Sequence, residues 1–248
     1  MKKIHLLIKK EEINEQKMAE GEKIAVVLDV LLATTTIVSA LEDGASEVIP
    51  VLDLQEAVGY QKQDGSDLFI LAGELQAKPV DGFIYPSPTF IRKVIKGKSL
   101  VLSTTNGTVA LRKSAGANAV YIASLLNNPF VAGEIAKAWH HGTVIVVCSG
   151  NSGEVSLEDL YGAGHFIDCL LKEQDEEMEI TDAALSALSM YRGNKENAYE
   201  VLKSSYVGRM FDKHQFESEL KFASQKGTIN LAPKLENGKI AIAAPVQQ

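Results

Sequence analysis

Four apolar segments of this chain each run directly into a short polar cluster. The clusters begin at Asp29 after KIAVVL, at Gly73-Glu74 after LFILA, at Ser103 after KSLVL and at Cys148 after TVIVV. In an open α/β sheet the carboxyl ends of parallel strands lie along one edge, and ligands bind there. The pattern therefore predicts one crevice in which acids, hydroxyls and backbone N–H groups come together.

The spacing of apolar residues predicts strands that alternate with helices. Strands are expected at 2–9, 24–30, 46–52, 68–73, 99–104, 119–124 and 143–149. Helices are expected between them at 33–42, 53–63, 107–115 and 129–140. Runs that are apolar on both faces are typical of buried parallel strands. The alternation implies right-handed crossovers and a mostly parallel sheet covered by helices on both faces, which is a three-layer α/β/α fold.

From residue 156 the pattern becomes helical. Ser156, followed three residues later by Asp159, is similar to a capping box. Further helices fit residues 181–191, 195–211 and 214–224. The apolar stretch at 239–245 then predicts a last strand that rejoins the sheet. We therefore expect a single α/β domain over residues 1–248, with residues 156–230 mainly helical.

Composition narrows the function classes. The chain has 248 residues, of which 46% are hydrophobic and 23% charged, as in ordinary globular proteins. The net charge of −7 and the lack of a basic stripe argue against nucleic-acid binding. Lys9-Lys10, after the first strand, is interpreted as a solvated edge. No apolar run is long enough for a membrane helix or a signal peptide, and two cysteines suggest neither disulfides nor zinc, so we expect a cytoplasmic protein.

The acids at the strand ends are candidate catalytic residues. Asp29 follows a buried strand, where a carboxylate either caps the next helix or binds a cation such as Mg²⁺. A haloacid-dehalogenase nucleophile needs a second Asp two residues on, and Leu31 stands there. Glu74 is either a second acid of the crevice or a surface turn residue. Glu158 and Asp159 lie in the first turn of a predicted helix, where acids also complement the helix dipole.

The hydroxyls and glycines of the clusters are candidate anion-binding groups. Thr34 and Thr35 begin a helix, where they either bind an anion or pack against the sheet. In STTNGT, Asn106-Gly107 permits a tight turn with positive φ, and the flanking hydroxyls favour anion binding over a plain turn. The candidate substrate-binding residues are Thr34, Thr35, Ser103, Thr104, Thr105, Asn106, Gly107, Thr108, Ser149, Gly150 and Gly153.

Cys148 is interpreted as a small buried residue. A protein-tyrosine-phosphatase loop requires Arg six positions after its cysteine, and Glu154 is found there. The chain also lacks the G-x-x-x-x-G-K-[ST] phosphate loop.

Together, the motifs resemble those of the 2-phosphosulfolactate phosphatases. The matching segments are DVLLATTTIVSALEDGA, AGEL, STTNGTVAL and CSGNSGEVSLEDLYGAG, and the resemblance spans about residues 4–245. It implies a three-layer α/β/α fold and Mg²⁺-dependent hydrolysis of the phosphate monoester of a sulfonated lactate. Enzymes of this family act in coenzyme M biosynthesis in methanogens and have relatives in bacteria. We expect Asp29 and Glu74 to hold Mg²⁺, with Glu158 or Asp159 as a third carboxylate.

The chain departs from the pattern of this family in three places. Leu32 and Leu75 stand where the pattern has Arg, and the stretch at 82–88 lacks its Asp, Gly and Asn. Guanidinium groups bind phosphate and sulfonate by paired contacts, so their loss predicts altered substrate binding. Two hypotheses follow: a phosphatase acting on 2-phosphosulfolactate or another small phosphate ester, and a protein that binds such an anion without hydrolysing it. The sequence is compatible with a homodimer, and the apolar loop 83–90 is a candidate interface or lid.

Overall fold

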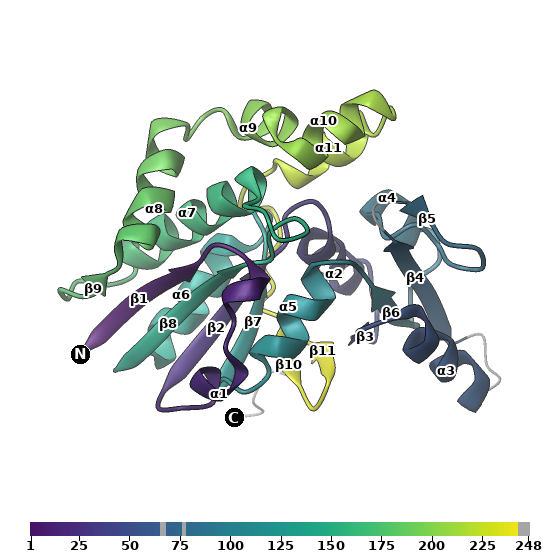
Figure 1. The fold of residues 1–248 in the computed structure, drawn as a ribbon, viewed down its shortest axis with the longest axis horizontal. Helices are drawn as coiled ribbons and strands as arrows, with labels where there is room; N and C mark the ends of the chain where they lie inside the picture. Colours follow the sequence, from purple (N-terminus) through teal and green to yellow (C-terminus); the bar gives the residue numbers. More distant parts are fainter. Residues whose placement is uncertain (65–67, 76–77, 243–248) are drawn as a thin grey trace.

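A mixed β-sheet runs through the computed structural model, which describes residues 1–64, 68–75 and 78–242 (Figure 1). Its order is β5-β4-β6-β3-β11-β10-β7-β2-β8-β1-β9. The strands are β1 (Lys2–Leu7), β2 (Lys23–Leu28), β3 (Glu47–Val51), β4 (Phe69–Leu75), β5 (Lys78–Pro79), β6 (Ser99–Ser103), β7 (Ala119–Ala123), β8 (Gly142–Cys148), β9 (Glu179–Ile180), β10 (Lys234–Glu236) and β11 (Lys239–Ala241). Each strand predicted from the sequence is present, and the ends differ by at most two residues in all but the last one.

Two parallel blocks of strands are joined by an antiparallel hairpin. In one block β7, β2, β8, β1 and β9 are parallel, and in the other β3, β6 and β4 are parallel. The β10–β11 hairpin lies between them, where Lys234 pairs with Tyr121 and Ile240 pairs with Val48. The predicted last strand is thus confirmed over 239–241, whereas residues 243–245 of that prediction lie outside the described part of the chain.

The partner of the last strand, β10, was not predicted. The hairpin turns at Asn237 and Gly238, whose φ angles are 51° and 79°. Asn-Gly is the commonest sequence for a two-residue hairpin turn, because both residues tolerate positive φ. The turn signal was therefore present in the sequence, although the three-residue strand before it was too short to recognise.

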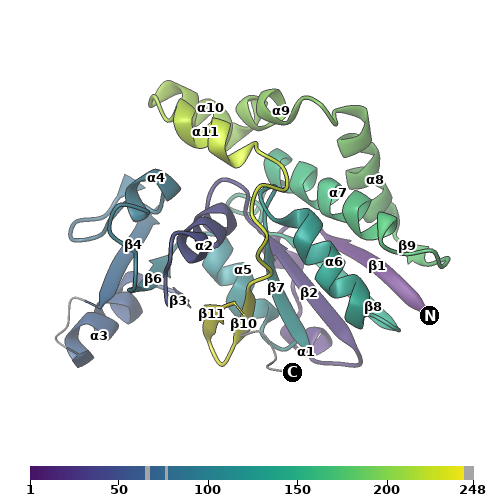
Figure 2. The same cartoon turned by 180° about the vertical axis from the view of Figure 1, so that it is seen from behind.

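Helices cover both faces of the sheet (Figures 1 and 2). They are α1 (Glu15–Met18), α2 (Ala33–Glu42), α3 (Leu54–Asp64), α4 (Pro88–Ile91), α5 (Gly107–Ser114), α6 (Asn128–Ala138), α7 (Leu157–Lys172), α8 (Asp182–Gly193), α9 (Ala198–Ser204), α10 (Tyr206–Lys213) and α11 (Glu217–Ala223). Along β2, Val26 and Leu28 belong to the core formed with α6 and α7, whereas Ala25 and Val27 belong to the core formed with α2 and α5. Because side chains alternate across a strand, this division confirms the three layers.

The helix predicted over 195–211 is wrong in one respect, since it is two helices. Ser205 separates α9 from α10 with an extended backbone (ψ 167°), and its hydroxyl accepts a hydrogen bond from Gly208 N at 2.9 Å. A serine N-cap of this kind starts a new helix. The break turns α10 and α11 over the carboxyl ends of the strands, as both ribbon views show (Figures 1 and 2).

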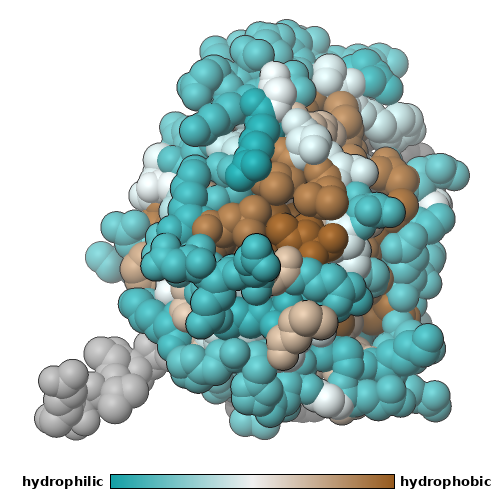
Figure 3. Space-filling model, turned by 90° about the vertical axis from the view of Figure 1, so that its left-hand side faces the viewer, coloured by the Kyte–Doolittle hydropathy of each residue, from teal (hydrophilic) through white to brown (hydrophobic). Residues whose placement is uncertain are grey.

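One side of the molecule, which carries β1, β9 and α8, has an apolar area surrounded by polar residues (Figure 3). Leu185 of α8 is 42% exposed, and Val155 and Leu157 at the start of α7 are also exposed. The edge strand β9 pairs with Lys3 and Ile4 alone, so it covers only the first half of β1. Short edge strands of this kind limit pairing with other chains.

Within the described residues, the longest apolar helices fall short of what crossing a bilayer requires.

Candidate active site

A cavity of about 390 Å³ lies at the carboxyl ends of β2, β6 and β8, below α10. We call its polar side the floor, which consists of Asp29, Glu74, Thr104, Thr105, Asn106, Gly150, Asn151, Ser152, Ser156, Glu158 and Asp159. We call its opposite side the roof, which consists of Tyr85, Pro86, Tyr206, Val207, Met210 and Phe211. Leu31, Leu32 and Ala33 complete the wall. The predicted crevice at the strand ends therefore exists, and each acid predicted to be catalytic borders it.

Asp29 is a floor residue directly after β2 and is 7% exposed. Its Oδ1 accepts a hydrogen bond from Ala33 N at 3.3 Å. Burial raises the pKa of Asp29 to about 7; the Ala33 N–H lowers it, and the charges of Glu158 and Glu74 raise it further. A buried carboxyl of this kind gains from a bound cation, because the cation offsets the loss of hydration.

Gly107 packs closely against Asp29, and a side chain at Gly107 would collide with the carboxylate. A Cβ at Gly107 would lie 2.5 Å from Ala33 Cβ and 2.6 Å from Asp29 Oδ2. The turn with positive φ that Asn106-Gly107 would permit is not formed, because Gly107 is the first residue of α5 and neither residue lies in the left-handed region. The glycine is required by close approach instead of by turn geometry.

Asp159 holds two loops of the floor together. Its Oδ1 accepts from Val30 N at 2.8 Å and its Oδ2 accepts from Gly150 N at 3.1 Å. Its own N–H donates to Ser156 Oγ at 3.2 Å, which confirms the predicted cap. Burial raises the pKa of Asp159 well above its usual value, and Asp29 adds to this. With both oxygens bound to backbone N–H groups, Asp159 is placed to brace the loops after β2 and β8.

Glu158 and Glu74 are the remaining acids of the floor. Glu158 is 3% exposed, and burial raises its pKa. Glu74 accepts from Thr105 N at 2.7 Å and from Thr105 Oγ1 at 3.2 Å. Nowhere in the described ranges do three or more His, Cys, Asp or Glu residues gather closely enough to hold a metal ion by themselves. Mg²⁺ usually takes one or two carboxylates together with water and substrate phosphate, so Asp29 with Glu158 or Glu74 fits it.

The threonines after Asp29 are structural in this arrangement. Thr34 and Thr35 are 0% exposed, and their hydroxyls donate to Asp29 O at 2.9 Å and to Val30 O at 2.8 Å. Neither borders the cavity, so the structure does not bring these two predicted anion-binding residues to it. Their hydroxyls fix the backbone around Asp29.

The STTNGT loop is partly open to the cavity. Thr104, Thr105 and Asn106 line it. Thr104 Oγ1 accepts from Thr108 N at 3.1 Å, and Thr108 Oγ1 donates to Thr104 O at 2.9 Å, so this pair holds the start of α5. Ser103 borders a neighbouring pocket, which shares Glu74, Thr104 and Thr105 with the cavity.

The loop after β8 is shaped by its glycines. Gly150, at φ 70°, borders the cavity, and a Cβ there would lie 2.8 Å from Lys9 Cβ. Gly153, at φ 88°, and Ser149, which is fully buried, do not border it. Cys148 is 1% exposed and burial raises its pKa, in agreement with the predicted small buried residue.

Lys10 is a residue of the site that the sequence did not reveal. Instead of forming a solvated edge, its side chain is 11% exposed and its Nζ donates to Asn106 Oδ1 at 2.7 Å. Ser152 N donates to the same oxygen at 3.2 Å. The short turn after β1 is held here by Lys10 N, which donates to Ser149 O at 3.2 Å. This placement depends on contacts between distant segments, for which the local sequence carries no signal.

The roof was also largely missed. The apolar loop 83–90, expected to be an interface or a lid, contributes Tyr85 and Pro86 to the cavity. Opposite them, α10 contributes Met210 and Phe211. Nothing local in α10 distinguishes these side chains from those of a helix that packs on the core.

Comparison with known proteins gives a consistent result. The sequence model of the family described as 2-phosphosulpholactate phosphatase matches residues 7–238. A protein of Caldanaerobacter subterraneus subsp. tengcongensis, named probable 2-phosphosulfolactate phosphatase, is 35% identical over 228 residues, which are 91% of this chain and 92% of that protein. Proteins with the same name from Clostridium acetobutylicum and Clostridium perfringens are 34% and 36% identical, each over 96% of this chain and over 99% and 95% of their own lengths. The chain belongs to the 2-phosphosulpholactate phosphatase family.

Proposed function

We propose that this protein is a Mg²⁺-dependent phosphomonoester hydrolase that converts 2-phosphosulfolactate to sulfolactate and phosphate. The observation that carries the proposal is the group of buried acids on the floor, which are Asp29, Glu158 and Asp159. The family and the names of the relatives support the substrate. The volume of the cavity, about 390 Å³, also supports a small substrate.

Charge is the reason for including a metal. Asp29, Glu74, Glu158 and Asp159 all border one cavity, and a phosphate monoester is itself an anion. Mg²⁺ held by Asp29 with Glu158 or Glu74 would offset this repulsion and either polarise the phosphoryl group or lower the pKa of the attacking water. Asp159 keeps the loops around that position fixed through Val30 N and Gly150 N.

Lys10 supplies a positive charge from the protein itself. Its ammonium bonds to Asn106, which borders the cavity, and its charge lowers the pKa of Asp29. Lys10 also pairs with Glu11 Oε1 at 2.9 Å and is not one of the described lining residues, so its charge would act on a bound phosphate from behind Asn106. The roof residues Tyr85 and Phe211 exclude water from the same space, which strengthens these electrostatic interactions.

The test is phosphate release from 2-phosphosulfolactate, measured with Mg²⁺ and with a chelator. The proposal expects turnover that needs the metal and is lost in Asp29→Asn. Ligand-dependent thermal stabilisation without turnover would contradict it and would favour a protein that only binds the anion.

A second candidate is hydrolysis of a different small phosphate ester. Leu31 and Leu32 border the cavity beside the apolar roof, and its described lining residues include neither Lys nor Arg. Such a wall favours an ester whose organic part carries less charge than sulfolactate. Metal-dependent turnover of an aryl phosphate that exceeds turnover of 2-phosphosulfolactate would identify this alternative.

A further inference from the structure

The roof consists of two pieces that are far apart in the sequence. Tyr85 and Pro86 belong to the segment 83–91, which ends in α4, and Met210 and Phe211 belong to α10. Neither piece is a named strand of the sheet.

Segment 83–91 is joined to the rest of the fold on both sides of Tyr85. Ile84 N donates to Leu71 O at 2.9 Å, and Gly73 N donates to Ile84 O at 3.0 Å, so Ile84 bonds to the backbone of β4. Thr36 Oγ1 donates to Pro86 O at 2.8 Å. These bonds hold the start of the segment but do not reach α10, and α11 supplies further contacts that join the segment to α10.

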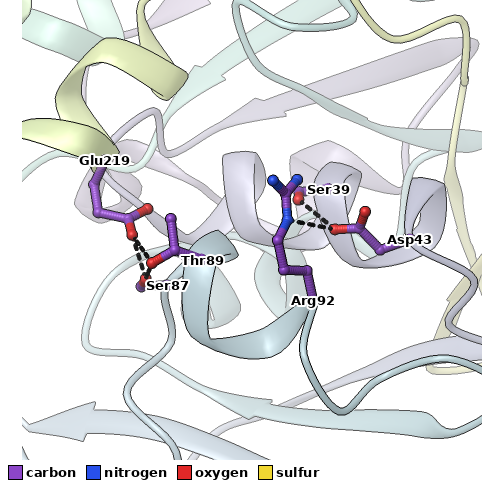
Figure 4. Close-up of polar contacts among 6 residues, drawn as sticks. All are labelled: Ser39, Asp43, Ser87, Thr89, Arg92 and Glu219. Carbon is purple, nitrogen blue, oxygen red and sulfur yellow. Dashed lines mark hydrogen bonds and ion pairs between the residues drawn. The ribbon is translucent and has the colours of Figure 1, made fainter.

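The first contact is a buried carboxylate. Glu219 of α11 is 1% exposed, and its Oε1 accepts hydrogen bonds from Ser87 Oγ at 2.8 Å and from Thr89 Oγ1 (Figure 4). Its Oε2 is buried and lacks a hydrogen-bond partner among the described residues. A buried carboxylate is unfavourable unless its hydrogen bonds compensate, so this pairing is a specific feature of the fold.

The hydroxyl of Ser87 bonds to Glu219 instead of capping its own helix. Ser87 is the N-cap residue of α4, but its hydroxyl makes no capping bond to the described residues of that helix. Serine at this position usually accepts a hydrogen bond from its own helix. Here the hydroxyl, which is fully buried, donates to Glu219 of α11, 132 positions away. The bond joins segments instead of stabilising the short helix.

The second contact is aromatic. Tyr85 stacks on Phe216, with ring centroids 5.6 Å apart and an interplanar angle of 7°. Phe216 also contacts Phe211, at 5.5 Å between centroids, and Phe211 borders the cavity. The residues around the start of α11 therefore touch both pieces of the roof.

Tyr85 is the roof residue with a hydroxyl group that these contacts hold. It borders the cavity, and burial with the nearby charges of Glu74 and Glu219 raises its pKa to about 12. Its hydroxyl therefore keeps its proton and remains a hydrogen-bond donor at any physiological pH.

We propose that Glu219 is a positioning residue, which holds segment 83–91 against α11 so that the Tyr85 hydroxyl binds an oxygen of the substrate. The proposal rests on the proposed function, because it assumes an ester bound on the floor. In this proposal Tyr85 binds the substrate directly, whereas Glu219 acts indirectly by keeping Tyr85 in position.

The same segment offers a matched control. Arg92, at the end of α4, contacts Asp43 Oδ2 at 3.3 Å, and Ser39 Oγ lies 3.1 Å from the same oxygen (Figure 4). This group ties α4 to α2 and has no member among the described cavity-lining residues. Asp43→Asn therefore loosens the segment at its other end, away from Tyr85.

The experiment compares Glu219→Ala, Glu219→Gln, Asp43→Asn and Tyr85→Phe with the unaltered protein. We expect Glu219→Ala to raise KM about tenfold with kcat changed less than about threefold, because binding geometry is lost while the floor remains. Glu219→Gln keeps an acceptor oxygen and recovers most of the loss. In the Tyr85→Phe background, Glu219→Ala adds little, since both changes remove one interaction. Asp43→Asn changes KM less than about twofold.

Hydrogen exchange of the backbone of 83–91 is measured in parallel and needs no turnover. Faster exchange there in Glu219→Ala, and not in Asp43→Asn, supports the proposal. Unchanged KM and unchanged exchange in Glu219→Ala would overturn it, as would equal effects of Glu219→Ala in the presence and absence of the Tyr85 hydroxyl. If the unaltered protein hydrolyses no phosphomonoester, the proposed function fails; the exchange result, and the binding of vanadate, then decide on Glu219 independently. If Glu219→Ala does not fold, Glu219→Gln and Tyr85→Phe carry the test.

Discussion

The floor and the roof of the cavity are built in opposite ways. Floor residues stand next to strand ends, and hydrogen bonds such as those from Val30 N and Gly150 N to Asp159 fix them. Roof residues come from segment 83–91 and from α10. The segment bonds to the backbone of β4 at Ile84, and a buried carboxylate and aromatic rings of α11 join the two pieces. The floor is acidic and belongs to the rigid sheet edge, whereas the roof is mostly apolar and depends on contacts between distant segments.

This difference suggests a division of roles in the proposed enzyme: the floor would carry the chemical step, and the roof would select the ligand. Groups that hold charge need a fixed environment, and sheet edges provide it. In the proposed enzyme the roof would exclude water and contact the organic part of the ligand, and such groups tolerate more movement. Changes in the floor should therefore affect turnover and stability, whereas changes in the roof should affect mainly KM.

The largest effect is expected for Asp29→Asn. We expect kcat to fall by about 10³-fold or more, because the proposed Mg²⁺ would lose a ligand. Measurement of phosphate release at saturating substrate checks this, with Asp43→Asn as an acid outside the cavity for comparison.

The same variant should be more stable at high pH. Asp29 has a pKa of about 7 in the folded protein against 3.8 ordinarily, so the folded state binds a proton that the unfolded state has lost. Stability therefore falls as the pH rises from 3.8 to about 7, and it stays lower above that range. Asp29→Asn removes this penalty, which is on the order of a few kcal/mol. Urea unfolding at pH 5 and pH 8 measures it, and an unaltered pH slope would contradict the assignment.

A smaller effect is expected for Asp159→Ala. The backbone N–H groups of Val30 and Gly150 would lose their acceptor inside a buried site. Leaving buried donors unsatisfied costs about 1–3 kcal/mol each. We expect a lower urea midpoint together with reduced kcat. Asp159→Asn keeps one acceptor oxygen, so its urea midpoint should lie between those of the unaltered protein and Asp159→Ala. Equal midpoints for all three proteins would show that Asp159 does not stabilise the loops of the floor.

Gly107→Ala tests how tightly the floor is packed. The new Cβ would lie 2.5 Å from Ala33 Cβ, so the loop after β2 or the start of α5 must shift. Such overpacking costs about 1–3 kcal/mol. The control is Gly133→Ala in α6, where a Cβ meets nothing within 4 Å and helix propensity predicts a gain of about 0.5–1 kcal/mol. Thermal unfolding of both variants separates close packing from a general effect of removing glycine.

Gly107 also marks the limit of what the sequence reveals. Apolar periodicity predicted the strands, the helix over 33–42 with its first and last residues, and the gathering of acids at one edge, because these depend on local spacing. It could not predict that Gly107 is required by the Asp29 side chain, or that Lys10 lies against Asn106, because both depend on distances between separate segments. The roof could not be predicted for the same reason, because it combines residues from separate segments.

Lys10→Ala should affect the floor moderately. Loss of the ammonium beside Asn106 should raise KM for the phosphate ester about tenfold and weaken inhibition by inorganic phosphate. Lys10→Arg keeps the charge and should recover part of the loss. Lys9→Ala is the matched control, because Lys9 Nζ donates to Gly153 O at 2.8 Å and neither residue is among the described lining residues of the cavity. Equal KM values for the Lys9 and Lys10 variants would remove Lys10 from phosphate binding.

The smallest effect is expected in the roof, for Met210→Ala. Met210 is partly buried and borders the cavity, so its truncation removes apolar contact with the organic part of a ligand. We expect KM to rise about two- to threefold for an aryl phosphate, which presents a ring to the roof, and less for 2-phosphosulfolactate. Met190→Ala in α8 is the control, since Met190 packs on the same core away from the cavity. A fall in kcat for both esters would show instead that the roof acts on the chemical step, and the division between floor and roof would then not hold.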